Sequence, residues 1–557
     1  MPVTPLLLPT PHSCSWTGAW HAVVGIPRIH QDSALPAEGY RVTIGAGGID
    51  LFCGDPAGER HGQATLVQLR LQSPSGVWPG CDITDHPVFA TRGVMLDVSR
   101  DRIPTLGELQ RVIRQLAGWK INHLQLYVEH TVAYQGHDAA WAGTDALTLA
   151  ELKLLEATCH EVGITLAANQ NCFGHLSAWF RQPAYAPLAE IAPEGWWDFN
   201  GLVSRQGGFS LCPGDPRALA LVDDLLSQLL PTLAAPWVNI GCDETFDVGQ
   251  GRSQAEVAQR GRATVYAEFV AKVCAIAKRH GKRPQFWADI ALEHPEALSL
   301  LPDDLLGLAW GYEGDSPFAR WLDQLGSREA WVCPGTSSWR SFTGRTTERK
   351  ANLLAAARDG AGRATGYLVT DWGDLGHRQQ WPISLHGLAE AAHRAWSGTA
   401  PYDPRTGGLH ALGDPAWGSW LDTLGDLDLD LRRLGGRTPG VPLRNATALF
   451  TDWHKPLDDK WMSDLDPWFR CRERLQDLPS MPQANVELDV TLLHVHLSLE
   501  RAIARRSGDH QRLRQLAPEV HGLVEAHRHS WLARCRPGGL AASCSHDLAI
   551  AEALERA

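Results

Sequence analysis

The sequence lacks the cysteine patterns of a zinc site or a disulfide framework. Its 12 cysteines are scattered over 557 residues, with no CxxC pair and no compact Cys/His cluster at zinc spacing. Five of them lie in apolar or strand-like contexts, where a free buried thiol is the usual state: Cys172, Cys212, Cys242, Cys274 and Cys333. We therefore expect free thiols, a reducing compartment, and neither a metal nor another cofactor.

The sequence also lacks the features of a membrane protein, a secreted protein and a nucleic-acid binder. No apolar run approaches the ~20 residues of a membrane span, and residues 1–15 have no basic region of a signal peptide. The net charge of -12 argues against nucleic acid as a partner. With 44% hydrophobic residues, the chain has the composition of a globular protein. Together these absences favour a cytoplasmic protein without a membrane partner.

Three composition patterns divide the chain. Residues 1–90 contain short strand-like pieces, such as 22–26 and 64–69, between glycines and prolines, and predict a small α/β domain. Residues 91–400 alternate strand-like and helical runs. Residues 401–557 contain amphipathic helical runs at 417–434, 486–505 and 511–533, and predict an α-helical C-terminal domain.

The middle region predicts a (β/α)8 TIM barrel. Its eight strand-like runs are 93–100, 123–130, 164–171, 237–244, 283–289, 305–312, 330–337 and 366–374. The helical runs are 106–119, 147–162, 217–230, 263–280, 317–325, 348–358 and 385–396. In such barrels the catalytic groups lie at the C-terminal ends of the strands.

The fourth strand ends on two adjacent carboxylates, Asp243 and Glu244. Before them, Val238, Ile240 and Cys242 alternate with small or polar residues, as in a strand with one apolar face. Two neighbouring acids repel, so their pKa values separate, which suits chemistry that needs one proton donor and one standing anion. The alternative is an acidic pair in a solvated loop or at a helix N-terminus.

Other strand ends carry polar or aromatic residues as well. They are Asp97, Arg100, Glu129, His130, Asn169, Asn171, His175, Trp287, Asp289, Trp310, Tyr312, Thr370, Trp372 and Asp374. These residues predict a polar cup with aromatic walls, which is typical of carbohydrate sites.

The region from about residue 92 to 396 resembles glycoside hydrolase family 20, the β-N-acetylhexosaminidases. The resemblance rests on Asp97-Val-Ser-Arg100, Gly174-His175, Ile240-Gly-Cys-Asp-Glu244 and Trp372-Gly-Asp374. The three-part layout is similar to the intracellular bacterial branch of the family. The resemblance implies an exo-acting enzyme that removes terminal, non-reducing β-linked GlcNAc or GalNAc from a small oligosaccharide or glycoconjugate. It also implies a substrate-assisted retaining mechanism, one of the recognised exceptions to the two-carboxylate scheme.

The resemblance gives the acid pair its roles. It implies that Glu244 is the general acid and then the base that activates water, and that Asp243 orients the acetamide N–H of the substrate. Glu244 must then be protonated at the working pH, so a raised pKa is expected. His175 and Glu129 are expected to form a buried relay that orients Glu244, although His175 could equally be a structural histidine.

The remaining expected residues bind the sugar. Arg100 is expected to hold ring hydroxyls, with a salt bridge to Asp97 as the alternative. Trp287, Trp310, Trp339 and Trp372 are candidates for the walls around the sugar, some of which could be core residues. Asp374 is expected to bond a sugar hydroxyl.

One stretch departs from the family pattern. Many members place a Tyr and an Asp near the end of strand seven, where this chain has Cys333-Pro-Gly-Thr-Ser-Ser-Trp339. We expect Tyr312, at the end of strand six, to replace the tyrosine that bonds the acetamide oxygen.

Two other functions compete with this interpretation. The first is a non-catalytic barrel that binds N-acetyl sugars. The second is a metal-dependent hydrolase that uses four irregularly spaced histidines: His123, His130, His137 and His175. The helical C-terminal region is a candidate interface for a homodimer.

Overall fold

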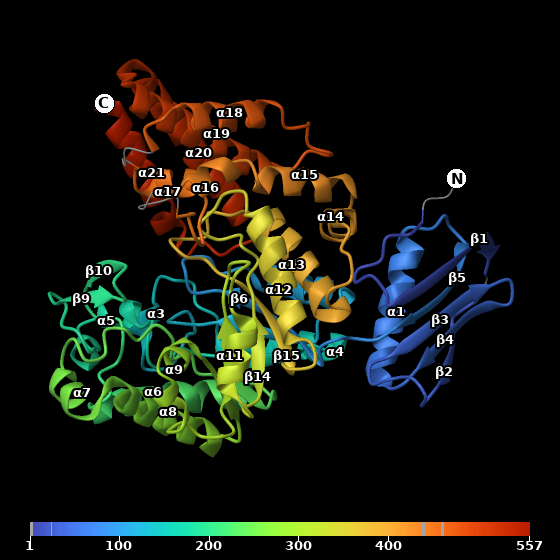
Figure 1. The fold of residues 1–557 in the computed structure, drawn as a ribbon, viewed down its shortest axis with the longest axis horizontal. Helices are drawn as coiled ribbons and strands as arrows, with labels where there is room; N and C mark the ends of the chain where they lie inside the picture. Colours follow the sequence, from blue (N-terminus) through green and yellow to red (C-terminus); the bar gives the residue numbers. More distant parts are fainter. Residues whose placement is uncertain (1–3, 24, 436–440, 458–461) are drawn as a thin grey trace.

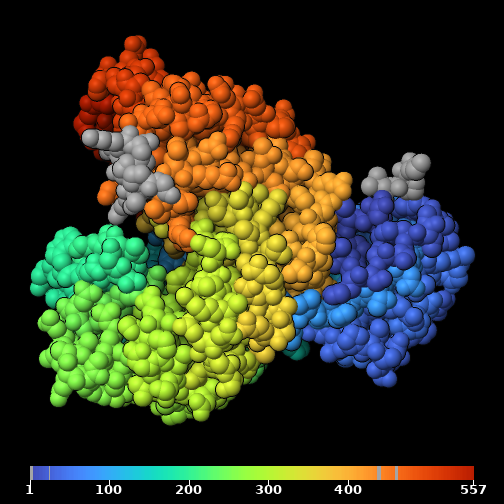
Figure 2. All heavy atoms as spheres, viewed as in Figure 1, coloured from blue at the N-terminus to red at the C-terminus, as the bar shows by residue number. Residues whose placement is uncertain are grey.

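A computed structural model describes residues 4–23, 25–435, 441–457 and 462–557. The chain forms an N-terminal sheet, a central barrel and a C-terminal group of helices (Figure 1). In the space-filling view, the C-terminal helices, in orange and red, pack directly on the barrel, and the N-terminal region, in blue, adjoins another side of it (Figure 2).

The N-terminal region is a five-stranded sheet with one helix, α1 (Pro56–Leu71), packed on it. The strand order is β1-β5-β3-β4-β2, with β1 at Ser13–Ala22, β2 at Arg28–Gln31, β3 at Tyr40–Gly45, β4 at Gly48–Cys53 and β5 at Val77–Asp85. The α/β character is confirmed.

Two strand predictions in this region need correction. The strand at 64–69 is wrong, because these residues lie inside α1. The Asp55 side chain caps this helix by accepting from Gly58 N at 2.7 Å, and Leu66 and Leu69, three residues apart, are buried. The strand at 22–26 is also wrong, because β1 ends at Ala22; Val24 lies outside the described residues.

The middle region is a closed, parallel eight-stranded barrel, so the TIM-barrel prediction is confirmed. Its strands are β6 (Thr91–Asp97), β7 (His123–Tyr127), β8 (Thr165–Asn169), β11 (Trp237–Asn239), β12 (Arg283–Trp287), β13 (Leu306–Trp310), β14 (Ala330–Cys333) and β15 (Gly366–Asp371). The longer helices between and after them are α2 (Leu106–Gly118), α4 (Leu149–Val162), α6 (Pro216–Leu229), α8 (Arg262–Arg279), α11 (Phe318–Leu325), α12 (Thr346–Gly360) and α13 (Trp381–Ser397). The strands end earlier than predicted, so most of the polar residues expected at strand ends lie in the loops that follow. Asp97, Asn169, Trp287, Trp310 and Thr370 remain within the strands.

The segment between β8 and α6 carries an excursion from the barrel. It contains the short helix α5 (Ser177–Phe180) and a hairpin of β9 (Trp196–Phe199) and β10 (Val203–Gln206).

The C-terminal region is helical, as predicted. Its long helices are α19 (Val486–Ser507), α20 (His510–Leu532) and α21 (Leu540–Glu555). The single helix predicted at 417–434 is wrong: α15 (Ala416–Gly425) and α16 (Leu429–Leu434) are separate helices. Asp428 lies at the break between them, and its carboxylate accepts from Ala448 N at the start of α17 (Ala448–His454). In the part of the chain that the structure describes, no helix has the length and apolar character needed to cross a membrane.

Candidate active site

The acid pair lies in a loop with left-handed backbone just after β11. Gly241, Cys242 and Glu244 have φ values of +70°, +74° and +52°. Such conformations cost free energy in residues other than glycine and are concentrated at functional sites. Hydrogen bonds hold the loop: Gly241 N donates to Asn239 Oδ1 (3.0 Å), Glu244 N donates to Asp289 Oδ2 (2.9 Å), and the Tyr266 hydroxyl donates to Cys242 O (3.0 Å).

A layer of amides inside the barrel supports this loop from below. Gln125 Oε1 accepts from Asn169 at 3.0 Å and from Asn239 at 3.1 Å, and Gln125 Nε2 donates to Gln285 Oε1 at 2.8 Å. All four side chains are buried and come from β7, β8, β11 and β12. Four neighbouring strands therefore fix the position from which the acid loop departs.

The two acids differ in exposure. The Asp243 side chain is 8% exposed and that of Glu244 is 27% exposed. Asp243 Oδ1 is buried and has no hydrogen-bond partner among the described residues. Burial raises the pKa of Glu244, and the Asp243 and Asp374 carboxylates add to the increase, whereas His175 and Arg205 oppose it. This arrangement favours a protonated Glu244 that can reach a ligand, beside an acceptor that lacks a donor.

His175 joins the acid pair to Glu129. Its Nε2 lies 3.1 Å from Asp243 Oδ2 and 3.5 Å from Glu244 Oε2, and its Nδ1 lies 3.6 Å from Glu129 Oε1. Burial opposes a charge on the ring, but the Asp243 and Glu244 carboxylates together outweigh it and raise the pKa of His175 to about 9. The predicted neighbours are therefore brought together, although His175 lies closer to Asp243 than to Glu244.

Arg100 lies at the centre of three carboxylates. Its Nη1 donates to Asp97 Oδ2 at 2.8 Å and lies 3.5 Å from Asp374 Oδ1, and its Nη2 lies 3.3 Å from Glu129 Oε1. The salt bridge to Asp97, the alternative to sugar binding, is thus present, and the role of Arg100 in holding ring hydroxyls stays a prediction. The guanidinium carbon also lies 5.0 Å from the ring centre of Trp372.

The four predicted tryptophans and Tyr312 form one aromatic cluster with Tyr127. Trp310 stacks on Tyr312 with ring centres 5.3 Å apart, and Tyr312 meets Trp339 edge-on at 4.9 Å. The indole N–H groups of Trp287 and Trp339 are buried and lack hydrogen-bond partners among the described residues. The cluster is therefore apolar except for the two indole N–H groups, which could still donate hydrogen bonds.

The stretch after β14 replaces the family pattern with hydroxyl groups that are already engaged. Thr336 Oγ1 and Ser338 Oγ each donate to Asp371 Oδ1 at 2.6 Å. The Tyr312 hydroxyl lies within the aromatic cluster, where it accepts from Trp372 Nε1 at 2.8 Å. The hydroxyl also has a hydrogen-bond contact with the side chain of Thr370.

Two residues near the acids have no role assigned from the sequence. Asp289, one of the residues named at the strand ends, accepts from Glu244 N and, at 3.4 Å, from Trp310 Nε1. Arg205 lies in the hairpin of the excursion, with its guanidinium carbon 3.7 Å from the ring centre of Phe199. No sequence period marks that segment, so nothing in the sequence pointed to Arg205.

The four histidines of the metal-hydrolase alternative do not converge. His123 packs against Trp331 inside the barrel, His137 contacts Tyr185 and Asp224, and His175 lies beside Asp243. Over the described ranges, no group of three or more His, Cys, Asp or Glu is placed to hold a metal ion. All 12 cysteines are free thiols, as expected.

Comparisons with known proteins agree with the barrel and its acid loop. Residues 89–323 match the family described as Glycosyl hydrolase family 20, catalytic domain. A Beta-hexosaminidase of Akkermansia muciniphila is 27% identical over 291 residues, which cover 47% of this chain and 58% of that protein. A Beta-N-acetylhexosaminidase of Cellulomonas fimi is 24% identical over 288 residues, covering 48% of this chain and 53% of that protein. The chain thus spans little more than half the length of these curated relatives.

Solved structures show the same fold. The crystal structure of a beta-N-acetylhexosaminidase matches with a TM-score of 0.59 at 19% identity, covering 74% of this chain and 97% of that one. Flavobacterium johnsoniae chitobiase matches with a TM-score of 0.58 at 16% identity, covering 93% of this chain and 96% of that one. Residues 89–323, which hold most of the barrel strands and the acid loop, are thus similar to the catalytic domain of glycosyl hydrolase family 20.

Proposed function

We propose that the protein is an exo-acting β-N-acetylhexosaminidase that removes a terminal, non-reducing β-linked N-acetylhexosamine from an oligosaccharide or glycoconjugate. The observation that carries the proposal is the pairing of Asp243, whose buried Oδ1 has no donor among the described residues, with the more exposed Glu244. A substrate acetamide N–H would supply the missing donor.

In the first step the substrate's acetamide oxygen attacks the anomeric carbon. The bond to the leaving oxygen breaks, and Glu244 transfers its proton to that oxygen. Asp243 accepts the acetamide N–H and stabilises the positive charge of the oxazolinium ring. The raised pKa of Glu244 keeps its proton available at the start.

In the second step water attacks the anomeric carbon and gives a proton to the Glu244 carboxylate. The acetamide oxygen leaves the anomeric carbon, which restores the acetamide and retains the anomeric configuration. We propose that Arg100 and Asp374 hold ring hydroxyls, and that Trp287, Trp310, Trp339 and Trp372 enclose the sugar and its acetyl methyl group. The proximity of Arg100 to Asp374 and the clustering of the tryptophans support these roles. Tyr312 is the proposed donor to the acetamide oxygen.

Replacing the proposed acid tests the function. Glu244→Gln keeps the shape of the side chain but removes its proton-donating role, so we expect kcat/KM for p-nitrophenyl β-N-acetylglucosaminide to fall by about 10²–10⁴-fold. A thiazoline analogue of the oxazolinium ring should inhibit the wild-type protein. Turnover by the variant at the wild-type rate would remove the assignment, and binding of the sugar without any turnover by the wild type would favour a sugar-binding barrel.

Two expectations stay predictions. Light scattering in solution would test a homodimer through the C-terminal helices. Cell fractionation would test a cytoplasmic location.

A further inference from the structure

We propose that the C-terminal helices position the sugar site through a buried ion pair between Arg378 and Asp547. Arg378 belongs to the loop that follows β15, residues 372–380, which we call the β15 loop. This loop carries Trp372 and Asp374, both assigned to sugar binding above. The inference rests on the proposed function and adds positioning residues from outside the barrel.

The β15 loop is bonded to the other half of the sugar site. Gly373 N donates to Asp97 Oδ2 at 3.0 Å, and Asp97 in turn holds Arg100. His377 Nδ1 donates to the Arg100 backbone oxygen at 2.6 Å. A displacement of the β15 loop would therefore be transmitted to Arg100 as well as to Trp372 and Asp374.

Two helices of the C-terminal region, α20 and α21, also contact the β15 loop. Arg378 Nη1 donates to Asp547 Oδ2 of α21 at 2.8 Å, and the two side chains are 3% and 0% exposed. Ser530 Oγ of α20 donates to Gln380 Oε1 at 2.8 Å. Although burial opposes it, Arg378 leads the contacts that lower the pKa of Asp547, so the carboxylate is charged. A charge pair buried this deeply fixes the loop, because separating its members leaves an unpaired buried charge.

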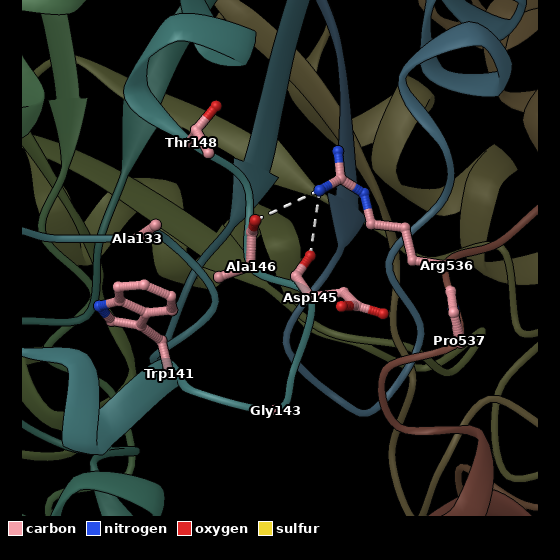
Figure 3. A pocket seen from close by; sticks show the side chains of 8 residues that line it. All are labelled: Ala133, Trp141, Gly143, Asp145, Ala146, Thr148, Arg536 and Pro537. Atoms are coloured by element: carbon pink, nitrogen blue, oxygen red, sulfur yellow. Dashed lines mark hydrogen bonds between the residues drawn. The ribbon is translucent and has the colours of Figure 1, made fainter.

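The connection between α20 and α21 is hydrogen-bonded to the segment that follows Arg100. Between α20 and α21, Arg536 N donates to Ile103 O at 2.8 Å, and Thr105 N donates to Arg534 O at 2.9 Å. Arg536 also donates to the backbone oxygens of Asp145 and Ala146, which lie between α3 (Asp138–Trp141) and α4 (Figure 3). These residues line a pocket of about 450 Å³. The C-terminal region thus contacts both loops that present sugar-binding side chains.

The acid pair takes its contacts from the barrel instead. His175 and Asp289 hold Asp243 and Glu244, as described above. The C-terminal helices should therefore control sugar affinity, whereas the position of the acid pair itself depends on contacts within the barrel.

The experiment compares Asp547→Asn with a matched control, Asp452→Asn. Asp452 is also a buried aspartate of the C-terminal region, but its carboxylate pairs with Arg505 and Arg506 of α19. Both variants lose one buried carboxylate charge. Folding is checked by circular dichroism, KM and kcat are measured across pH with the p-nitrophenyl substrate, and N-acetylglucosamine binding is titrated directly.

We expect Asp547→Asn to raise KM and the dissociation constant of N-acetylglucosamine by about ten- to a hundredfold, since small displacements of positioning groups have effects of this size. Asp452→Asn should retain wild-type constants. If Asp547→Asn fails to fold, Arg378→Lys and Arg378→Met replace it; the lysine should restore affinity that the methionine loses.

Equal sugar affinity in the Asp547 and Asp452 variants, or in the lysine and methionine variants, would overturn the positioning role. A wild-type protein that binds N-acetylglucosamine without turnover would overturn the proposed function and leave the affinity comparison decisive. A wild-type protein that does not bind the sugar would overturn both.

Discussion

Glu244 is surrounded by charges that shift its pKa in opposite directions. Burial, Asp243 and Asp374 raise the pKa, and His175 and Arg205 lower it. An acid catalyst works only while protonated, so the basic limb of the kcat/KM profile follows the pKa of this carboxyl group. Replacing one of these charged neighbours should therefore shift the basic limb of the pH profile.

Arg205→Met removes a positive charge that lowers the pKa of Glu244. The acid should keep its proton to higher pH, so the basic limb should move upward. Asp374→Asn, the matched variant of opposite sign, removes a charge that raises this pKa and should move the limb downward. Profiles of kcat/KM between pH 4 and about 9 bracket the ordinary glutamate value and test both shifts. Two limbs that move in the same direction would refute this electrostatic arrangement.

The sequence predicted which residues gather at the site, but not how they pair. Asp243, Glu244, Arg100 and the tryptophans follow different strands, and a parallel barrel brings such positions to one end. The closer approach of His175 to Asp243 than to Glu244 depends on loop backbone, which has no sequence period. Arg205 lies on a hairpin outside the barrel repeat, so strand-end reasoning could not find it.

The loop after β11 determines the direction of the acid pair. Gly241 has φ +70°, and a Cβ there would lie 2.2 Å from Asn171 Oδ1, a buried side chain. The loop can thus keep its course only with glycine at this position.

Gly241→Ala should lower both stability and kcat, because relief of the clash moves Asp243 and Glu244. Gly281→Ala is its control: Gly281 has φ +71°, but a Cβ there would meet nothing within 4 Å. The control should lose about 1–2 kcal/mol of stability from the backbone conformation and keep kcat. Thermal unfolding and steady-state kinetics measure these effects, and equal kcat values in the two variants would contradict the role assigned to the loop.

Most strands and helices of the barrel could be predicted from the sequence. All eight barrel strands were located from period and breaker residues, since buried strands and amphipathic helices alternate clearly there. Residues 64–69 were misassigned because their local run resembles a strand, whereas the cap at Asp55 and the packing of Leu66 and Leu69 select a helix. The choice between strand and helix for these six residues therefore depends on contacts outside the six-residue run.

The N-terminal sheet is joined to the barrel by a buried cluster of polar groups. Lys120, which follows α2 of the barrel, donates to Asp85 Oδ2 at 2.8 Å, and the two side chains are 1% and 0% exposed. Asp85 also accepts from Tyr40 of β3 and from Trp396 of α13. One carboxylate therefore connects two regions of the molecule.

Asp85→Asn should destabilise the protein by about 3–5 kcal/mol, because it leaves the Lys120 charge buried without a counter-ion. The active site lies elsewhere, so kcat at 20 °C should be unchanged while the unfolding temperature falls. Asp50→Asn is the control in the same sheet, because it removes only an exposed pair with Arg28 and a contact with His30. Chemical unfolding measures the difference, and similar stabilities of the two variants would argue against the buried link.

We propose that the substrate's own acetamide, oriented by Asp243, is the nucleophile. A series of p-nitrophenyl glycosides with acetyl, monofluoroacetyl, difluoroacetyl and trifluoroacetyl groups tests it, because each fluorine makes the amide oxygen a weaker nucleophile. We expect kcat/KM to fall steeply and steadily along the series, by several powers of ten in total, in line with the size of nucleophilic effects on rate. Values of kcat/KM that stay constant along the series would contradict it and point to a nucleophile supplied by the protein.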